Sequence, residues 1–198
     1  MLPRFGEVGC VVGIDEVGRG CLAGPVVACS CVVYDDISGV NDSKKLNRAK
    51  RKNISNLVLS NPKNLVSFGV IEPDEIDKIN ILQATMKAMQ ISFENLNLKN
   101  VHILVDGNRG FDQKCKTIIK GDAKYFEIAV ASVLAKEYRD TLMENYAKAY
   151  PDYFFEKNFG YGTKKHIDAI KLFGKLNIHR KTFLKNILDN NDKSLILF

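Results

Sequence analysis

Short apolar segments rich in β-branched residues alternate along this chain with longer segments of helical spacing, and this alternation restricts the possible folds more than any other feature. Strands are expected over residues 8–14, 26–34, 66–71, 101–105 and 117–119. A polar connection at 41–52 is expected to run into a helix that continues to about residue 60. Further helices are expected over 74–96, 125–150, 163–173 and 181–188, with an aromatic loop at 151–162. An early strand pair followed by strand–helix units predicts an α/β fold, with a mixed sheet flanked by helices.

The length of 198 residues suits one domain with a C-terminal helical extension. We expect a core at 1–150, a basic helical extension packed on it at 151–190, and a tail at 191–198. No apolar run reaches the roughly 18–20 residues that span a bilayer, and no secretory signal is recognisable, so a cytoplasmic protein without membrane contact is expected. The five cysteines are odd in number and lack a Cys-x-x-Cys pair, which indicates small buried apolar residues.

Positive charge is concentrated near the C-terminus. The formal net charge is +6, and residues 153–188 hold eight basic and two acidic side chains, so the rest of the chain is formally neutral. A local basic surface is typical of proteins that bind a polyanion such as a nucleic acid. The alternative is a lysine-rich helix surface that is simply solvated. Charge alone leaves both interpretations open.

Four carboxylates follow short apolar segments. Asp15 and Glu16 follow the first, Asp106 follows the fourth, and Asp122 comes shortly after the fifth. Carboxylates at the buried ends of strands are unfavourable unless they are paired or bind a metal. Oxygen ligands without His or Cys favour Mg²⁺ or Mn²⁺, and two such ions about 3.5–4 Å apart commonly serve phosphodiester hydrolysis. The sequence therefore predicts an acidic metal site.

Each carboxylate also has a simpler interpretation. Neighbouring side chains on a strand point to opposite faces, so either the strand ends or bulges at Asp15, or Glu16 contributes differently from Asp15. Asp106 precedes a glycine and could form a turn. Asp122 could be the N-cap of a helix.

Two glycine-containing segments accompany the carboxylates. The first segment has the spacing Gly-x-Gly-x-x-x-Gly from Gly18 through Gly20 to Gly24, with Arg19 between the first two glycines. This is one residue longer than the dinucleotide-binding motif, and a strand rather than a helix follows, so we reject dinucleotide binding. The segment 161–166 places an aromatic residue, a glycine and a potential N-cap before a basic helix. Such a segment can hold a phosphate and pack a ring on a sugar or base. Its alternative is an ordinary capped helix with the aromatic ring in the core.

Eight motifs together resemble one known family. They are GIDEVGRG at 13–20, LAGPVVA at 22–28, DSKKL at 42–46, VDG at 105–107, KGD at 120–122, ASVLAK at 131–136 with Arg139-Asp140, GYGTKKH at 160–166 and IHRKTF at 178–183. In these motifs the chain resembles type 2 ribonuclease H, or ribonuclease HII, of the bacterial type, over almost its whole length.

The resemblance implies a ribonuclease-H-like catalytic core with two Mg²⁺ or Mn²⁺ ions held by Asp15, Glu16, Asp106 and Asp122. It implies hydrolysis on the 5′ side of ribonucleotides, in RNA/DNA hybrids or embedded singly in duplex DNA, leaving 3′-hydroxyl and 5′-phosphate ends. It further implies that particular residues recognise the 2′-hydroxyl, namely Gly18, Arg19, Gly20 and Tyr161. Contacts to substrate phosphates are expected from Ser43, Lys44, Lys45, Thr163, Lys164, His179 and Arg180. Glycine suits the first role because only an absent side chain lets the backbone approach a sugar.

Three alternatives differ from this hypothesis. Ribonuclease HIII is the nearest, but Arg19, Asp122 and the lack of an extra N-terminal domain are expected to exclude it. A non-catalytic nucleic-acid-binding module would bind without metal-dependent cutting. Another nuclease of the same fold, such as an integrase, would not prefer an embedded ribonucleotide.

The tail raises a separate question. Leu195–Phe198 follows a polar segment and resembles the Leu-x-Leu-Phe ending of bacterial sliding-clamp-binding motifs, with Ser194 in place of the usual Gln. It is expected either to dock on a sliding clamp or to pack on the body of the protein. Nothing in the sequence indicates an obligate oligomer, so a monomer is expected.

Overall fold

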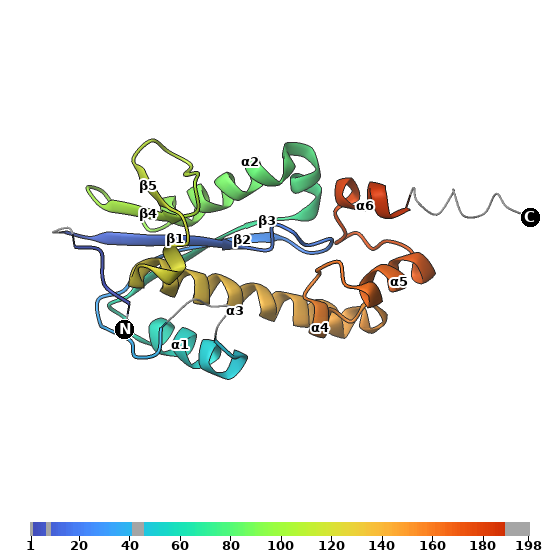
Figure 1. Cartoon of the computed structure of the whole chain (residues 1–198), viewed down its shortest axis with the longest axis horizontal. Helices are drawn as coiled ribbons and strands as arrows, with labels where there is room; N and C mark the ends of the chain where they lie inside the picture. Colours follow the sequence, from blue (N-terminus) through green and yellow to red (C-terminus); the bar gives the residue numbers. More distant parts are fainter. Residues whose placement is uncertain (1, 7–8, 41–45, 189–198) are drawn as a thin grey trace, which may run out of the picture.

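A five-stranded mixed sheet forms the centre of the computed structural model, which describes residues 2–6, 9–40 and 46–188 (Figure 1). The strands are β1 (Val11–Val17), β2 (Val26–Val32), β3 (Leu65–Ile71), β4 (His102–Asp106) and β5 (Cys115–Ile118). They lie in the order β3-β2-β1-β4-β5. β1 is antiparallel to β2 and parallel to β4, so the predicted mixed sheet is confirmed.

Helices cover both faces of the sheet. α1 (Arg48–Ser60) and α3 (Phe126–Ala149) pack on one face, and α2 (Pro73–Glu94) packs on the other (Figure 1). Two glycines let the helices approach the strands. A Cβ at Gly13 would lie 2.2 Å from the carbonyl of Glu127 in α3, and one at Gly69 would lie 2.0 Å from the carbonyl oxygen of Ala88 in α2. This close packing fixes α3 against the strand that carries the first two carboxylates.

One predicted helix is interrupted. The helix expected over 74–96 contains Asn80 in a non-helical conformation, with φ 66° and ψ 164°. The Asn80 side-chain oxygen accepts hydrogen bonds from the backbone nitrogens of Leu82 and Gln83, at 3.0 and 3.1 Å. Asn80 therefore acts as the N-cap of the second part of α2.

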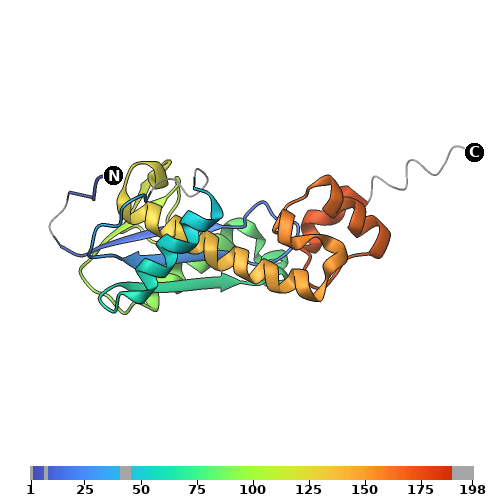
Figure 2. The ribbon, with the colours of Figure 1, turned by 90° about the horizontal axis from the view of Figure 1, so that it is seen from below.

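The C-terminal segment forms its own small core at one end of the molecule (Figure 2). In place of a plain aromatic loop it contains two short helices, η2 (Pro151–Tyr153) and α4 (Phe155–Asn158), which precede α5 (Lys164–Phe173) and α6 (Lys181–Leu188). Its apolar side chains pack on Leu22, Ala23 and Met143. Asp77 of α2 accepts hydrogen bonds from the backbone nitrogens of Lys181 and Thr182, which holds the start of α6 against the core.

The cysteines and the helix lengths bear on two further expectations. Three cysteines are buried and two are half-buried, and all five are free thiols. No helix in the described ranges is long and apolar enough to cross a membrane. The tail at 191–198 lies outside the residues that the structure describes.

Candidate active site

Asp15 and Asp106 lie on neighbouring parallel strands. β1 and β4 pair in register up to Ile14 and Val105, so the two aspartates are the next residues on their strands. Asp15 is buried and Asp106 is half-buried. The carboxyl ends of adjacent parallel strands are where ligands collect in α/β sheets. The strand register thus brings these two carboxylates to the same edge.

The strand that carries the acidic pair continues beyond the position predicted for its end. β1 runs to Val17 and pairs with β2 without a bulge, with Asp15 opposite Cys29 and Glu16 opposite Ala28. The two carboxylates therefore differ in their surroundings. Asp15 accepts a hydrogen bond from the backbone nitrogen of Glu16 at 2.7 Å, whereas Glu16 pairs with the exposed guanidinium of Arg19 at 3.2 Å. Of the alternatives left open by the sequence, a different contribution from each residue is the one that fits.

Burial and mutual repulsion raise the pKa values of the acidic pair. Burial is the largest cause for Asp15, whose pKa lies well above its usual range, and the charges of Glu16 and Asp106 raise it further. A hydrogen bond from Ser132 of α3 opposes this effect. Burial also raises the pKa of Glu16, although Arg19 lowers it and Asp106 raises it. Carboxylates this close repel one another, and a bound cation would remove that repulsion.

Asp122 is connected to the same edge through Asp106. The carboxylate of Asp106 accepts a hydrogen bond from the backbone nitrogen of Gly121 at 2.6 Å. The next residue, Asp122, is buried within η1 (Gly121–Ala123). The N-cap positions of η1 and α3 are held by Lys120 and Tyr125, so the helix-cap interpretation of Asp122 does not apply.

The carboxylates of the acidic edge do not form a ready-made metal site among the described residues. Within the described ranges, no group of three or more His, Cys, Asp or Glu side chains is already arranged to hold a metal ion. The donor set nevertheless fits a hard cation, because every side chain in it is a carboxylate. Mg²⁺ in particular keeps several waters and is commonly bound by one or two carboxylates together with substrate phosphates. Carboxylates that are not already gathered around one point are compatible with an ion of this kind.

The loop after β1 is held by two buried arginines. Arg139 of α3 donates to the carbonyl oxygens of Pro25, Ala23 and Phe159 at 2.8–3.0 Å. Arg180 donates to those of Gly18, Arg19 and Gly24 at 2.7–3.0 Å. Both guanidiniums are fully buried. The two buried guanidiniums therefore hold residues 18–25 in place through hydrogen bonds to backbone oxygen atoms.

The glycines of this loop have different environments. Gly18 has φ +94°, and a Cβ there would lie 2.2 Å from Nε of Arg139. A Cβ at Gly20 would meet no atom within 4 Å. Gly18 is thus required by the fold, whereas the space beside Gly20 is open to a ligand.

Tyr161 lies beside the same loop. It forms an antiparallel bridge with Cys21, and its side chain is 40% exposed, so it is not a core residue. Burial of its hydroxyl, with a smaller effect from Cys21, raises the pKa of Tyr161 to about 12. The phenol therefore keeps its proton at neutral pH and can donate a hydrogen bond.

The residues predicted to contact phosphates divide into three groups. Ser43, Lys44 and Lys45 lie outside the described residues. Thr163 and Lys164 are exposed at the start of α5, where the Thr163 hydroxyl accepts a hydrogen bond from the backbone nitrogen of His166. His179 and Arg180 are 1% and 0% exposed, so a direct phosphate contact does not fit these two residues. The reason is that their polar atoms are already taken by protein partners.

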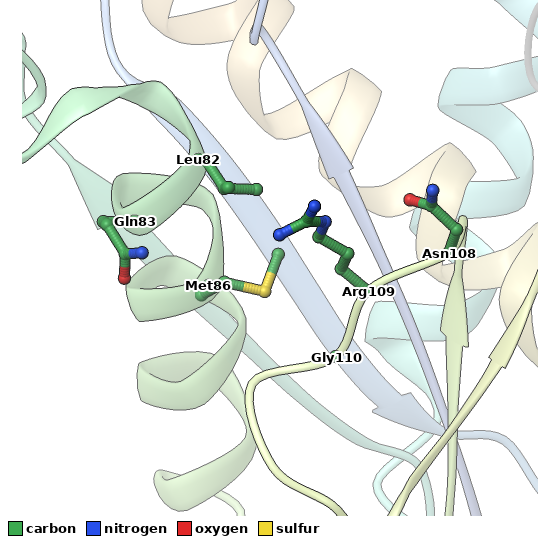
Figure 3. Close-up of a pocket in the computed structure, with 6 residues that line it drawn as sticks. All are labelled: Leu82, Gln83, Met86, Asn108, Arg109 and Gly110. Carbon is green, nitrogen blue, oxygen red and sulfur yellow. The ribbon is translucent and has the colours of Figure 1, made fainter.

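A groove of about 540 Å³ lies between α2 and the segment after β4 (Figure 3). Arg109 reaches across it toward Leu82 and Met86 of α2. None of the four carboxylates lines this groove. This groove is therefore separate from the acidic edge, whose carboxylates are buried or half-buried.

Solved structures share this fold. Ribonuclease H2 of Pyrococcus horikoshii superposes with a TM-score of 0.71 at 24% identity, covering 93% of this chain and 100% of that one. Ribonuclease HII of Archaeoglobus fulgidus, solved in complex with PCNA, gives 0.74 at 21% identity and covers 87% and 94%. A ribonuclease HIII in complex with Mn²⁺ gives 0.69 at 16% identity and covers 93% and 70%. The chain therefore has the ribonuclease-H-like fold.

Among proteins with this fold, the chain belongs to the ribonuclease HII family. The family model for ribonuclease HII matches residues 12–186. Ribonuclease HII of Chlamydia abortus is 48% identical over 176 residues, covering 87% of this chain and 83% of that protein. Ribonuclease HII of Rickettsia typhi is also 48% identical over 176 residues, covering 87% and 90%. These matches favour ribonuclease HII over the ribonuclease HIII and integrase alternatives.

Sequence reasoning assigned no role to three residues that support the site. Ser132 contacts Asp15, Arg139 holds the loop, and His166 contacts the backbone of Tyr161. All three lie in motifs of the family that the chain resembles, and this was the only indication in the sequence that they support the site. Their contacts join segments far apart in the chain, so their roles required the folded structure.

Proposed function

We propose that this protein is an endoribonuclease that hydrolyses the phosphodiester on the 5′ side of ribonucleotides, in RNA/DNA hybrids and singly embedded in duplex DNA. The observation that carries the proposal is the acidic edge at Asp15 and Asp106, reached by neighbouring parallel strands and linked through Gly121 to Asp122. Membership of the ribonuclease HII family supports the reaction type. The products would be 3′-hydroxyl and 5′-phosphate ends.

The carboxylates Asp15, Glu16, Asp106 and Asp122 would hold two divalent ions, Mg²⁺ or Mn²⁺. Bound ions of this kind lower the pKa of an attacking water and stabilise the leaving oxygen of a phosphodiester. The protein's own part is orientation. Ser132 and the backbone nitrogen of Glu16 fix the Asp15 carboxylate, and the backbone nitrogen of Gly121 fixes that of Asp106.

Recognition of the ribose would come from the loop at Gly18, Arg19 and Gly20 and from Tyr161. The open space at Gly20 allows a sugar to approach the backbone. The protonated phenol of Tyr161 offers a donor and a flat surface beside it. Only the 2′-hydroxyl distinguishes RNA from DNA at one nucleotide, so contacts at this point would give the specificity.

The segment at 151–190 would guide the duplex as a basic extension of a catalytic core at 1–150. Its seven lysines are exposed, whereas its one arginine, Arg180, is buried. Thr163 and Lys164 at the start of α5 remain the proposed phosphate contacts within the described residues. A monomer would suffice, since every proposed site residue comes from this chain.

A sliding clamp is a further proposed partner. The related protein of Archaeoglobus fulgidus was solved in complex with PCNA. The candidate docking peptide here is Leu195–Phe198, which lies outside the described residues. Deleting these four residues should abolish clamp pull-down without changing cleavage, and a loss of folding would favour packing on the body instead.

Cleavage of an RNA/DNA hybrid tests the acidic site. We expect cutting with Mg²⁺ or Mn²⁺, none with EDTA, and a loss of at least about a hundredfold in Asp15→Asn, Asp106→Asn and Asp122→Asn, or roughly 2.7 kcal/mol of barrier. Glu75→Gln, which changes a surface carboxylate paired with Lys87 outside the proposed site, is the control and should cut normally. Binding of the hybrid without cutting in either metal would favour a non-catalytic binding module.

A further inference from the structure

Two histidines of the C-terminal segment form a buried pair. The Nε2 atoms of His166 and His179 lie 3.1 Å apart, and the side chains are 0% and 1% exposed. Aromatic rings enclose them, with Phe155 edge-on to His166 at 5.3 Å and Tyr153 at 5.5 Å from His179. Both histidines remain to be assigned a role, since direct contact with substrate does not fit their burial.

The hydrogen bonds allow one arrangement of protons. The backbone nitrogen of Leu176 donates to Nδ1 of His179 at 2.8 Å, so that Nδ1 must be unprotonated. Nε2 of His179 then carries the proton and donates to Nε2 of His166. His166 is left with its proton on Nδ1, which donates to the carbonyl oxygen of Tyr161 at 2.9 Å. Every ring nitrogen has a partner of the correct kind.

This arrangement requires both rings to be neutral. A third proton would place two N–H groups against each other, either across the 3.1 Å contact or at Leu176. Burial lowers the pKa of both rings, that of His179 to about 4, with the neighbouring imidazole as a second cause for His179. The pair is therefore a fixed chain of hydrogen bonds at neutral pH.

The chain of hydrogen bonds ends at the backbone of Tyr161. The carbonyl oxygen of Tyr161 also accepts a hydrogen bond from the backbone nitrogen of Thr163 at 2.8 Å. The backbone nitrogen of Tyr161 donates to the carbonyl oxygen of Asn158 at 2.8 Å. His166 is the side chain that joins this turn to the loop before α6. The exposed ring of Tyr161 is thus supported from the buried side.

We propose that His166, held by His179, is a positioning residue for Tyr161 and so for recognition of the ribose. The inference rests on the proposed role of Tyr161 in reading the 2′-hydroxyl. His166 contacts only the backbone of Tyr161 and takes no part in the chemistry. The bridge between Tyr161 and Cys21 places the phenol beside the loop at Gly20, and the contact from His166 to the Tyr161 carbonyl oxygen helps to keep the turn in that place.

Two variants of His166 separate positioning from general support of the fold. His166→Asn keeps a donor near the position of Nδ1 and therefore the hydrogen bond to the Tyr161 carbonyl oxygen, but it loses the hydrogen bond to His179. His166→Gln keeps an acceptor near the position of Nε2 and therefore the hydrogen bond to His179, but it loses the hydrogen bond to the Tyr161 carbonyl oxygen. We expect kcat/KM on a duplex with one embedded ribonucleotide to fall at least about tenfold in the Gln variant and less than about threefold in the Asn variant.

The same two substitutions in a Tyr161→Ala background complete the test. Without the phenol ring, kcat/KM of the two histidine variants should differ by less than about twofold, because there is no ring left to position. A difference that persists, or histidine variants that behave alike with Tyr161 present, overturns this inference alone. Normal cleavage by Tyr161→Ala itself overturns the proposed role of Tyr161 and this inference with it.

The native protein offers an independent test if the variants fail to fold. Nitrogen-15 NMR of the histidine rings at pH 7 should find His179 protonated on Nε2 and His166 protonated on Nδ1, both neutral. A charged ring, or a proton on Nε2 of both rings, would contradict the proposed chain of hydrogen bonds.

Discussion

Removal of the Arg180 guanidinium should be among the most destabilising single changes in this protein. In Arg180→Met, the carbonyl oxygens of Gly18, Arg19 and Gly24 lose four hydrogen bonds from a fully buried cation. A hydrogen bond to a charged group contributes about 1.5–3 kcal/mol, but burying the cation offsets part of this. Allowing about 1–2 kcal/mol for each of the three carbonyls that lose the guanidinium, of which that of Gly18 keeps only a 3.5 Å contact from the backbone nitrogen of Cys21, we expect a loss of about 3–6 kcal/mol of unfolding free energy.

The assay is equilibrium unfolding in urea, followed by far-UV circular dichroism because the chain has no tryptophan. Arg180→Lys should lose roughly half as much, since an ammonium group cannot fork between carbonyls as a guanidinium does. Lys185→Met, at an exposed site in α6, is the control and should change stability by less than about 0.5 kcal/mol. A loss below about 1 kcal/mol in Arg180→Met, or equal losses in the Met and Lys variants, would refute the reasoning.

Three further predictions concern the same loop and the buried histidines. Gly18→Ala should lose at least about 2 kcal/mol in urea unfolding, because its φ is +94° and the new Cβ would lie 2.2 Å from Arg139; an unchanged midpoint would contradict this. Gly20→Ala should keep the wild-type midpoint, since its Cβ meets nothing, yet cleave an embedded ribonucleotide at least about tenfold more slowly; normal cleavage would exclude a close sugar contact. The folded-state pKa of about 4 for His179 lies below the unfolded value of about 6.5, so the unfolded chain binds more protons between these values and stability falls as pH drops through that window. The loss from pH 7.5 to pH 5 should be roughly 2 kcal/mol greater in the wild type than in His179→Gln, and parallel pH profiles would show that His179 does not titrate in this way.

Much of the fold follows from local patterns in the sequence. The β-branched segments and the helical spacing give the correct order of strands and helices, because both periodicities are set within a few residues. The end of β1 is different. The apolar run stops at Ile14, but pairing with β2 carries the strand through Asp15 and Glu16 to Val17. Strand pairing is a long-range contact, and the local pattern does not contain it.

The break in α2 shows a second limit. Apolar spacing continues through Asn80, so the pattern predicts one helix, whereas the Asn80 side chain caps a new helical segment. The buried arginines show a third. Arginine side chains are mostly exposed in proteins. The burial of Arg139 and Arg180 depends on carbonyl groups that include those of segments more than 100 residues away. The predicted phosphate contact of Arg180 does not fit this burial.

The candidate site was accessible from the sequence in a different way. The acidic residues and the glycines stand in motifs that resemble one family, and membership of that family is confirmed by the match over residues 12–186. The metal and sugar contacts themselves stay predictions. The strand register explains why Asp15 and Asp106 can act together, a relation that the motifs alone do not express.

Mapping the cut in a DNA duplex with a single ribonucleotide tests the central claim most directly. The labelled strand is compared with an all-DNA strand of the same sequence, so the two substrates differ in one 2′-hydroxyl. We expect one metal-dependent cut on the 5′ side of the ribonucleotide, with a 3′-hydroxyl end, and no cut in the all-DNA duplex. Cutting of both duplexes, or a cut on the 3′ side, would contradict the claim.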